Sequence, residues 1–131
     1  MPFRDHQLSA PAREMAEEHG RLYDMVGYLK FAIVDAVDEE TSTQAVNILF
    51  DRMALHFAVE EKTAAEVNEE WGDILRADHK KLLDSISCVR DIQWNERGER
   101  ERVLMRFVEA LTRHDAEVDA PILHAACRRH R

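Results

Sequence analysis

Residues that break or cross-link helices are scarce in this chain of 131 residues. It contains four Gly, three Pro and two Cys, and aromatic residues make up 7% of it. Cys88 and Cys127 would lie at opposite ends of an antiparallel helical bundle, too far apart for a disulfide, so we expect reduced thiols. The sequence shows no internal repeat and no low-complexity run, so we expect a compact chain that is not disordered. No stretch approaches the roughly 18 uninterrupted apolar residues of a membrane-spanning helix, and the N-terminal stretch lacks the apolar run of a signal peptide. We therefore expect a soluble, cytoplasmic protein with no membrane partner.

The balance of charge is acidic. The net charge is −8, with 34% charged and 45% hydrophobic residues, a composition that suits one folded domain with a sizeable core. An acidic chain is a poor partner for nucleic acid, so we expect none. The basic tail at 128–131 has a simpler interpretation, because cationic side chains at a helix C-terminus complement the helix dipole.

Apolar residues recur at steps of three and four along four long segments, a spacing typical of amphipathic helices. The segments cover about 9–37, 43–69, 73–92 and 99–129. Expected N-caps are Thr41 or Ser42 for the second helix and Asp73 for the third. Four long helices with short connections predict an all-α, antiparallel up-down-up-down four-helix bundle, with 1–11 as an N-terminal arm and 12–131 as the bundle.

Six polar side chains occupy inward positions of these stripes, where a soluble bundle normally carries Leu or Ile. They are His19, His56, Glu60, His79, His114 and Asp119. At about 1.5 Å of rise per residue they fall roughly 9–22 Å from one end of the bundle, within two to three turns of one another. Asp and Glu are almost never fully buried unless they are paired or bind a metal. A shared layer of this kind predicts a metal centre.

The fourth predicted helix carries two of these residues at an unusual spacing. In a straight α-helix Asp119 lies about 140° around the axis from His114, so we expect the two to flank one seam without stacking. The inward stripe should then continue through Val118 and Ile122. Pro121 should kink this helix, because it donates no backbone hydrogen bond.

The donor set favours two borderline divalent cations, chiefly iron, with manganese or zinc as alternatives. Neutral imidazoles bind such ions, and a carboxylate can bridge two of them while offsetting their charge. The predicted layer contains no thiolate, which excludes a zinc finger or an iron–sulfur cluster. A single His on an apolar helix face is more typical of a hydrogen-bonded core residue, so the interpretation depends on all six occurring together.

Four short motifs resemble, in chain order, those of the hemerythrin-like (HHE cation-binding) family. They are EEHGRL, HFAVE, DHKKLL and HDAEVD, and the resemblance spans about residues 12–125. It implies a four-helix bundle with a non-haem centre of two iron ions joined by an oxo or hydroxo bridge. By the same resemblance His19 and His56 would bind one iron, His79 and His114 the other, and Glu60 and Asp119 would bridge them.

One position departs from the family pattern. The third helix of the family carries HxxxH, and Leu75 stands where the first of those histidines would be. Leucine cannot bind a metal, so one ion would have an additional open position. Tyr23, one turn after His19, is a candidate replacement, although a core tyrosine with a hydrogen-bonded hydroxyl is the more common role. Glu61 is expected to be solvated.

We expect apolar side chains to surround the centre and exclude water, and they are Met15, Met53, Phe57 and Phe107. Such an apolar pocket, without an obvious proton-delivering residue, favours the binding of O2 or a related diatomic for carriage, storage or sensing. The alternative is a di-iron redox enzyme acting on peroxide or nitric oxide, which the open position at Leu75 favours. A third hypothesis is a metal-free helical interaction module. Whether the chain forms a homo-oligomer or needs a signalling partner stays open.

Overall fold

The computed structural model describes residues 10–93 and 95–129, and side chains within 17–93 and 95–125. The helices of this part are α2 (Ala10–Val34), α3 (Glu39–Val67), α4 (Glu69–Arg90), α5 (Arg97–His114), the π-helical segment η1 (Asp115–Asp119) and α6 (Ala120–Arg129). The described residues contain no strand, which confirms the all-α prediction. None of these helices has the length and apolar character needed to cross a membrane. The predicted arm lies outside the described residues, except that Ala10 and Pro11 already belong to α2.

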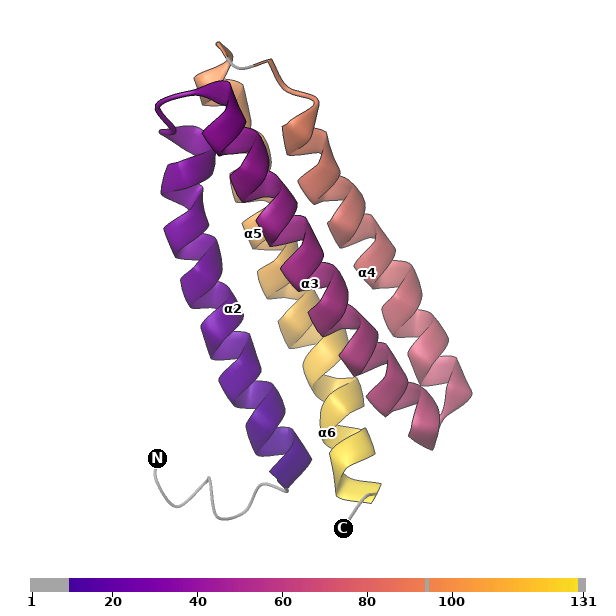
Figure 1. Ribbon diagram of the computed structural model, residues 1–131. Coiled ribbons are helices and arrows are strands. Elements are labelled where there is room, and N and C mark those ends of the chain that lie inside the picture. The colour runs from indigo at the N-terminus through magenta and orange to yellow at the C-terminus, as the bar shows by residue number, and fades with distance from the viewer. Residues whose placement is uncertain (1–9, 94, 130–131) are drawn as a thin grey trace.

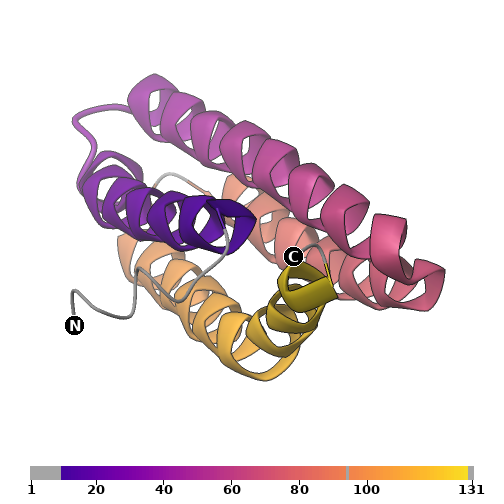
Figure 2. The same ribbon diagram turned by 90° about the horizontal axis from the view of Figure 1, so that it is seen from below.

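The helices pack side by side as a bundle. Figure 1 shows α2, α3, α4 and the continuous α5–η1–α6 segment next to one another, and Figure 2 shows them around a common interior. The connection from α2 to α3, the end of α4 and the start of α5 lie at one end of the molecule. The α3–α4 corner, the start of α2 and the end of α6 lie at the other end (Figure 1).

Two helix starts differ from the prediction. The α3 helix begins after Asp38, whose side chain accepts a hydrogen bond from the backbone N–H of Thr41 at 2.7 Å. The predicted caps Thr41 and Ser42 are therefore wrong. The α4 helix begins after Asn68, whose side chain accepts a backbone hydrogen bond in the first turn, and not after Asp73. Asp and Asn are both favourable N-cap residues, so the prediction had the right type of capping residue but placed the start of each helix too late in the chain.

Two buried polar side chains hold the C-terminal end of α2. The Ser42 hydroxyl donates to the Ile33 carbonyl at 2.7 Å. Arg100 is only 4% exposed, and its guanidinium donates to the Ile33 carbonyl at 3.3 Å and to the Val34 carbonyl at 3.0 Å. These carbonyls have no partner within the helix, so α3 and α5 supply the donors that the end of α2 lacks.

Gly72 allows α3 and α4 to lie close together at their shared corner. The sequence predicts a turn at Trp71 and Gly72, but both residues lie inside α4. A Cβ atom on Gly72 would lie 2.7 Å from the Cβ of Ala65 on α3. The absence of a side chain is therefore a packing requirement of the interface between the two helices.

We predict that Gly72→Ala destabilises the fold relative to Gly27→Ala. Both substitutions gain helix propensity, but a Cβ on Gly27 would meet nothing within 4 Å. The difference between their unfolding free energies, measured by urea titration, should be the overpacking cost of about 1–3 kcal/mol. Equal stabilisation by the two alanines would contradict the close approach of α3 and α4.

Candidate metal centre

The bundle brings all six predicted side chains into one cluster around Glu60. Its carboxylate is fully buried and reaches histidines on three different elements. Glu60 Oε2 lies 2.7 Å from Nε2 of His19 on α2 and 3.0 Å from Nε2 of His56 on α3. The other oxygen, Oε1, lies 3.2 Å from Nε2 of His79 on α4. A single carboxylate thus joins the histidines of both halves of the predicted site.

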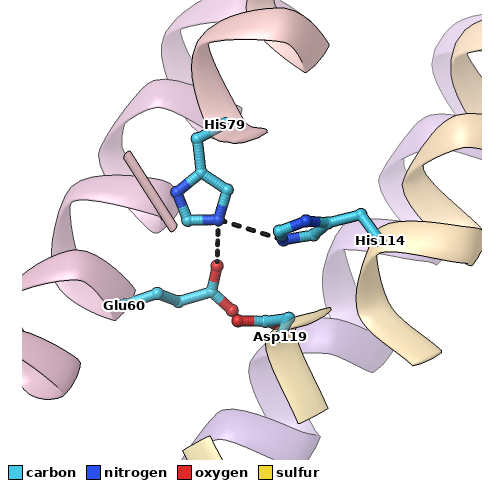
Figure 3. A group of neighbouring side chains, drawn as sticks. All are labelled: Glu60, His79, His114 and Asp119. Carbon is cyan, nitrogen blue, oxygen red and sulfur yellow. Dashed lines mark hydrogen bonds and ion pairs between the residues drawn. The ribbon is translucent and has the colours of Figure 1, made fainter. Parts of the chain in front are cut away.

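Asp119 and His114 complete the cluster from the last helical segment. In Figure 3 the carboxyl groups of Glu60 and Asp119 face each other, and His79 and His114 converge above them. The Nε2 atoms of the two histidines are 3.1 Å apart. The residues form two sets, and within each set the candidate ligand atoms all lie within 4.8 Å of one another. One set is Glu60, His79, His114 and Asp119. The other is His19, His56 and Glu60.

The π-helical segment determines where Asp119 points. From Asp115 to Asp119 the helix is wider than an α-helix, and the Ala120 N–H donates to the Asp115 carbonyl five residues earlier. Five residues then make little more than one turn, so Asp119 comes round to the face of His114. The predicted 140° offset is therefore wrong. Pro121 follows at the start of α6, where its missing N–H disfavours uninterrupted α-helical bonding.

The buried stripe shifts by one residue after the π segment. Leu104, Phe107, Leu111 and His114 are buried as predicted. Beyond them the buried residues are Asp119 and Leu123, whereas Val118 and Ile122 are only partly buried, which corrects the predicted stripe. One additional residue in the turn has therefore moved a carboxylate into the core.

Carboxylates also hold the outer nitrogens of two histidines. His79 Nδ1 lies 2.8 Å from Glu61 Oε2, and His114 Nδ1 contacts Asp78 Oδ2. The prediction that Glu61 is solvated is therefore wrong, because its side chain reaches sideways to α4. We assign the Nδ1–H of each ring as the donor to its carboxylate, which leaves each inner Nε2 as an acceptor.

In the neutral rings that bind a metal, these inner nitrogens meet the carboxylate oxygens as acceptors with no proton between them. Glu60 Oε1 and both oxygens of Asp119 are buried and have no hydrogen-bond partner among the described residues. An unpaired buried carboxylate costs several kcal/mol, and a cation removes that cost. A tetrahedral ion with bonds of about 2.1 Å places its ligands roughly 3.4 Å apart. The separations of 3.1 and 3.2 Å around His79 Nε2 are close to that value, so the donor atoms on this side of the cluster fit a divalent cation.

Without cations, bound protons neutralise the cluster. Burial alone would lower the pKa of His19, but the nearby carboxyls of Asp119 and Glu60 raise it to about 10. Burial, reinforced by the charge of Glu60, raises the pKa of Asp119 to about 8. Burial opposes ionisation of Glu60 too, yet its contacts with three histidines hold its pKa well below the usual range. The metal-free site therefore pairs an ionised Glu60 with protonated neighbours.

An apolar wall surrounds part of the cluster. Met53 and Phe107 are fully buried, and the Phe57 ring stacks on His79 with 4.0 Å between ring centroids. The side chain of Met15 lies outside the described residues. A cavity of about 10 Å³ adjoins the site, and its lining residues are His19, Leu22, Tyr23, Met53, His56, Phe57, Leu111 and Asp115. This volume admits about one water-sized molecule.

Besides the two histidines, the wall of this cavity contains Tyr23 and Asp115, so it is less apolar than the sequence predicts. The Tyr23 hydroxyl donates to Asp115 Oδ2 at 2.6 Å. Burial, together with this hydrogen bond, raises the pKa of Tyr23, so the hydroxyl keeps its proton. Tyr23 therefore has the hydrogen-bonded role that the sequence favours over metal ligation.

Among the described side chains, no other histidine or cysteine belongs to the cluster. Leu75 is fully buried one turn before His79 and offers no donor atom. His124 on α6 is exposed, and His6 lies outside the described residues. Cys88 is an exposed free thiol, and the side chain of Cys127 is not among those described.

No protein-family model matches the chain, and no curated protein or solved structure matches it either. Motifs and geometry alone therefore carry any assignment of this site.

We predict that the metal-free protein loses stability as the pH rises above about 6.5. His19 has a pKa of about 10 in the folded chain and 6.5 when unperturbed. Its stabilising contribution is therefore complete below pH 6.5 and is lost as the pH rises through the folded value. Urea unfolding in chelator at about pH 6 and about pH 9 would measure this. His19→Gln should reduce the dependence, and substituting the exposed His124 in the same way should not. A stability that rises over this interval would contradict the proton-filled site.

Proposed function

We propose that this chain is a hemerythrin-like metalloprotein with a dinuclear centre in an up-down-up-down bundle. The connections at alternating ends of the molecule favour that topology (Figure 1). The observation that carries the proposal is the convergence of Glu60 with histidines from three helices, next to buried carboxylate oxygens that have no hydrogen-bond partner among the described residues. Iron suits the mixed imidazole and carboxylate donors best, with manganese and zinc as alternatives.

The residues divide into two positions that share carboxylates. His19 and His56 face one oxygen of Glu60, whereas His79 faces the other, with His114 beside it. Glu60 is thus suited to bridge two ions, and Asp119 lies close enough to both positions to do the same. When bound, iron would supply reversible redox chemistry, while the surrounding side chains orient the ligands and limit water.

The small cavity favours O2 or a related diatomic as the exogenous ligand, for carriage, storage or sensing. It lies beside His19 and His56 and has room for about one water-sized molecule, which excludes most organic substrates. Its apolar residues, including Leu22 and Leu111, would keep bulk water away from a bound ligand. A cytoplasmic location remains a prediction from the sequence.

We predict about two iron ions per chain in protein purified without air. Glu60→Gln should lower the content to below one ion, because the amide loses the charge and one acceptor oxygen that serve both positions. His124→Gln should retain the wild-type content. Metal analysis and the optical spectrum before and after admission of air would measure this. One ion per chain would mean that Leu75 disables one position, and no ion at all would instead favour the metal-free interaction module.

A redox enzyme acting on peroxide or nitric oxide is the second candidate, and one feature specifically favours it. A groove of about 220 Å³ between α4 and the α5–η1 segment includes both Asp78 and His114 in its lining. The Asp78 side chain is 32% exposed and contacts His114 Nδ1. Asp78 therefore connects the solvent to a candidate metal ligand, which is the arrangement that proton transfer during turnover requires.

If turnover occurs, Asp78→Asn should slow it without removing the metal. The amide keeps an acceptor for His114 but cannot take up a proton at neutral pH, so steady-state consumption of peroxide or nitric oxide should fall by about 10²-fold or more. Asp84→Asn on the same helix is a matched control, because Asp84 is exposed and pairs with the surface residue Lys80 at 3.2 Å. Equal rates in the two variants, or a stable and reversible oxygenation without consumption, would exclude this candidate.

A further inference from the structure

Asp115 is a candidate ligand that the predicted set does not include. It is the first residue of η1, directly after His114. One of its carboxylate oxygens, a ring nitrogen of His19 and an oxygen of Asp119 all lie within 4.8 Å of one another. The π-helical turn makes this arrangement available, since residues four apart lie about one turn from each other and both Asp115 and Asp119 then face α2.

A second observation shows that this group is built for a cation. Asp119 is fully buried, and neither of its oxygens has a hydrogen-bond partner within the described part of the chain, although Oδ2 lies 3.0 Å from His19 Nε2. A second carboxylate next to these oxygens adds repulsion unless a proton or a metal ion neutralises it, and a metal ion can contact all three side chains at once. The group is therefore more than a cluster of acidic side chains.

Tyr23 fixes the position of Asp115. His19 and Tyr23 lie one turn apart on α2, so the same helix face carries a candidate ligand and the hydroxyl that donates to Asp115 Oδ2 at 2.6 Å. This hydrogen bond occupies one oxygen and leaves the other for a cation. Hydrogen bonds of this kind orient metal-binding carboxylates in many proteins.

We infer that Asp115 is an additional carboxylate ligand to the metal held by His19 and His56, and that Tyr23 is its positioning residue. This inference rests on the proposed dinuclear centre. It makes the two positions unequal. The first has two nitrogen donors with three carboxylates, namely Glu60, Asp115 and Asp119, whereas the second has two nitrogen donors with two carboxylates, Glu60 and Asp119.

The difference predicts which ions each position prefers. Additional carboxylate donors favour hard, oxygen-preferring cations such as Mn²⁺ and Fe²⁺. The position with Glu60, His79, His114 and Asp119 is wholly buried and has four ligands, the number typical of structural zinc sites. The oxygen-rich position also borders the small cavity, whose wall contains Asp115, so ion and small ligand meet there.

Anaerobic titration of the full chain with Mn²⁺ and with Co²⁺ tests this inference. Asp115→Asn keeps an acceptor for Tyr23 but removes the charge, and it should weaken binding at one of two positions by at least about tenfold to a hundredfold. Tyr23→Phe should produce a smaller loss at the same position. Glu117→Gln is the matched control, because Glu117 is an exposed carboxylate on the same π segment. Co²⁺ absorption provides a readout beyond affinity, since its intensity changes with coordination number.

The outcomes separate this inference from the proposed function. Two ions bound to wild-type protein, with Asp115→Asn matching Glu117→Gln in both affinity and Co²⁺ spectrum, would overturn the role of Asp115 and leave the dinuclear centre standing. Absence of metal from wild-type protein would overturn both. Circular dichroism identifies a variant that has unfolded. If Asp115→Asn has unfolded, the Co²⁺ spectrum of Tyr23→Phe tests the inference in its place. A changed spectrum would support Asp115 as a ligand positioned by Tyr23, and an unchanged spectrum would overturn that role.

Discussion

The burial of the Glu60 carboxylate is the constraint on which the interior of this bundle depends. A charge at a fully buried position is tolerated only if neighbouring groups neutralise it. Histidines from α2, α3 and α4 do so directly, and Asp119 from η1 faces the same carboxylate (Figure 3). All four helical segments therefore meet at one electrostatic centre. Protons can neutralise its buried carboxylates in the metal-free chain, and divalent cations would neutralise them more completely.

Around that centre the apolar core is interrupted. One continuous cluster contains most of the large buried side chains, among them Ile33, Leu49 and Phe107. Leu75 and Leu123 are equally buried but do not belong to that cluster. The polar layer thus lies within the hydrophobic interior, where its dielectric environment strengthens every charge–charge contact. A site of this kind couples ligand binding to the packing of the whole bundle, because displacing any of its helices breaks a contact with Glu60.

The regular features of the fold could be predicted from the sequence, and the irregular ones could not. Apolar spacing of three and four indicates helices, and polar residues within those stripes identified all six members of the cluster. The direction of Asp119 could not be predicted, because α-helical spacing does not apply across a π segment and such a segment has no simple sequence signature. The role of Glu61 could not be predicted for a different reason, since its helix position faces away from Glu60 but its side chain is long enough to reach His79. Asp115 and Tyr23 come together only through tertiary packing, across 92 residues of sequence.

The π segment gives the chain length between His114 and Pro121 a particular significance. Removing one of the four residues between His114 and Asp119 would restore uninterrupted α-helical winding and place the carboxylate four residues after His114, only about 40° from it around the helix axis. The carboxylate and Leu123 would then keep their inward direction, and α5 would keep its packing. The wider turn therefore absorbs one extra residue without moving the carboxylate out of the core, so bundles with four-residue and five-residue spacings at this point can present the same interior.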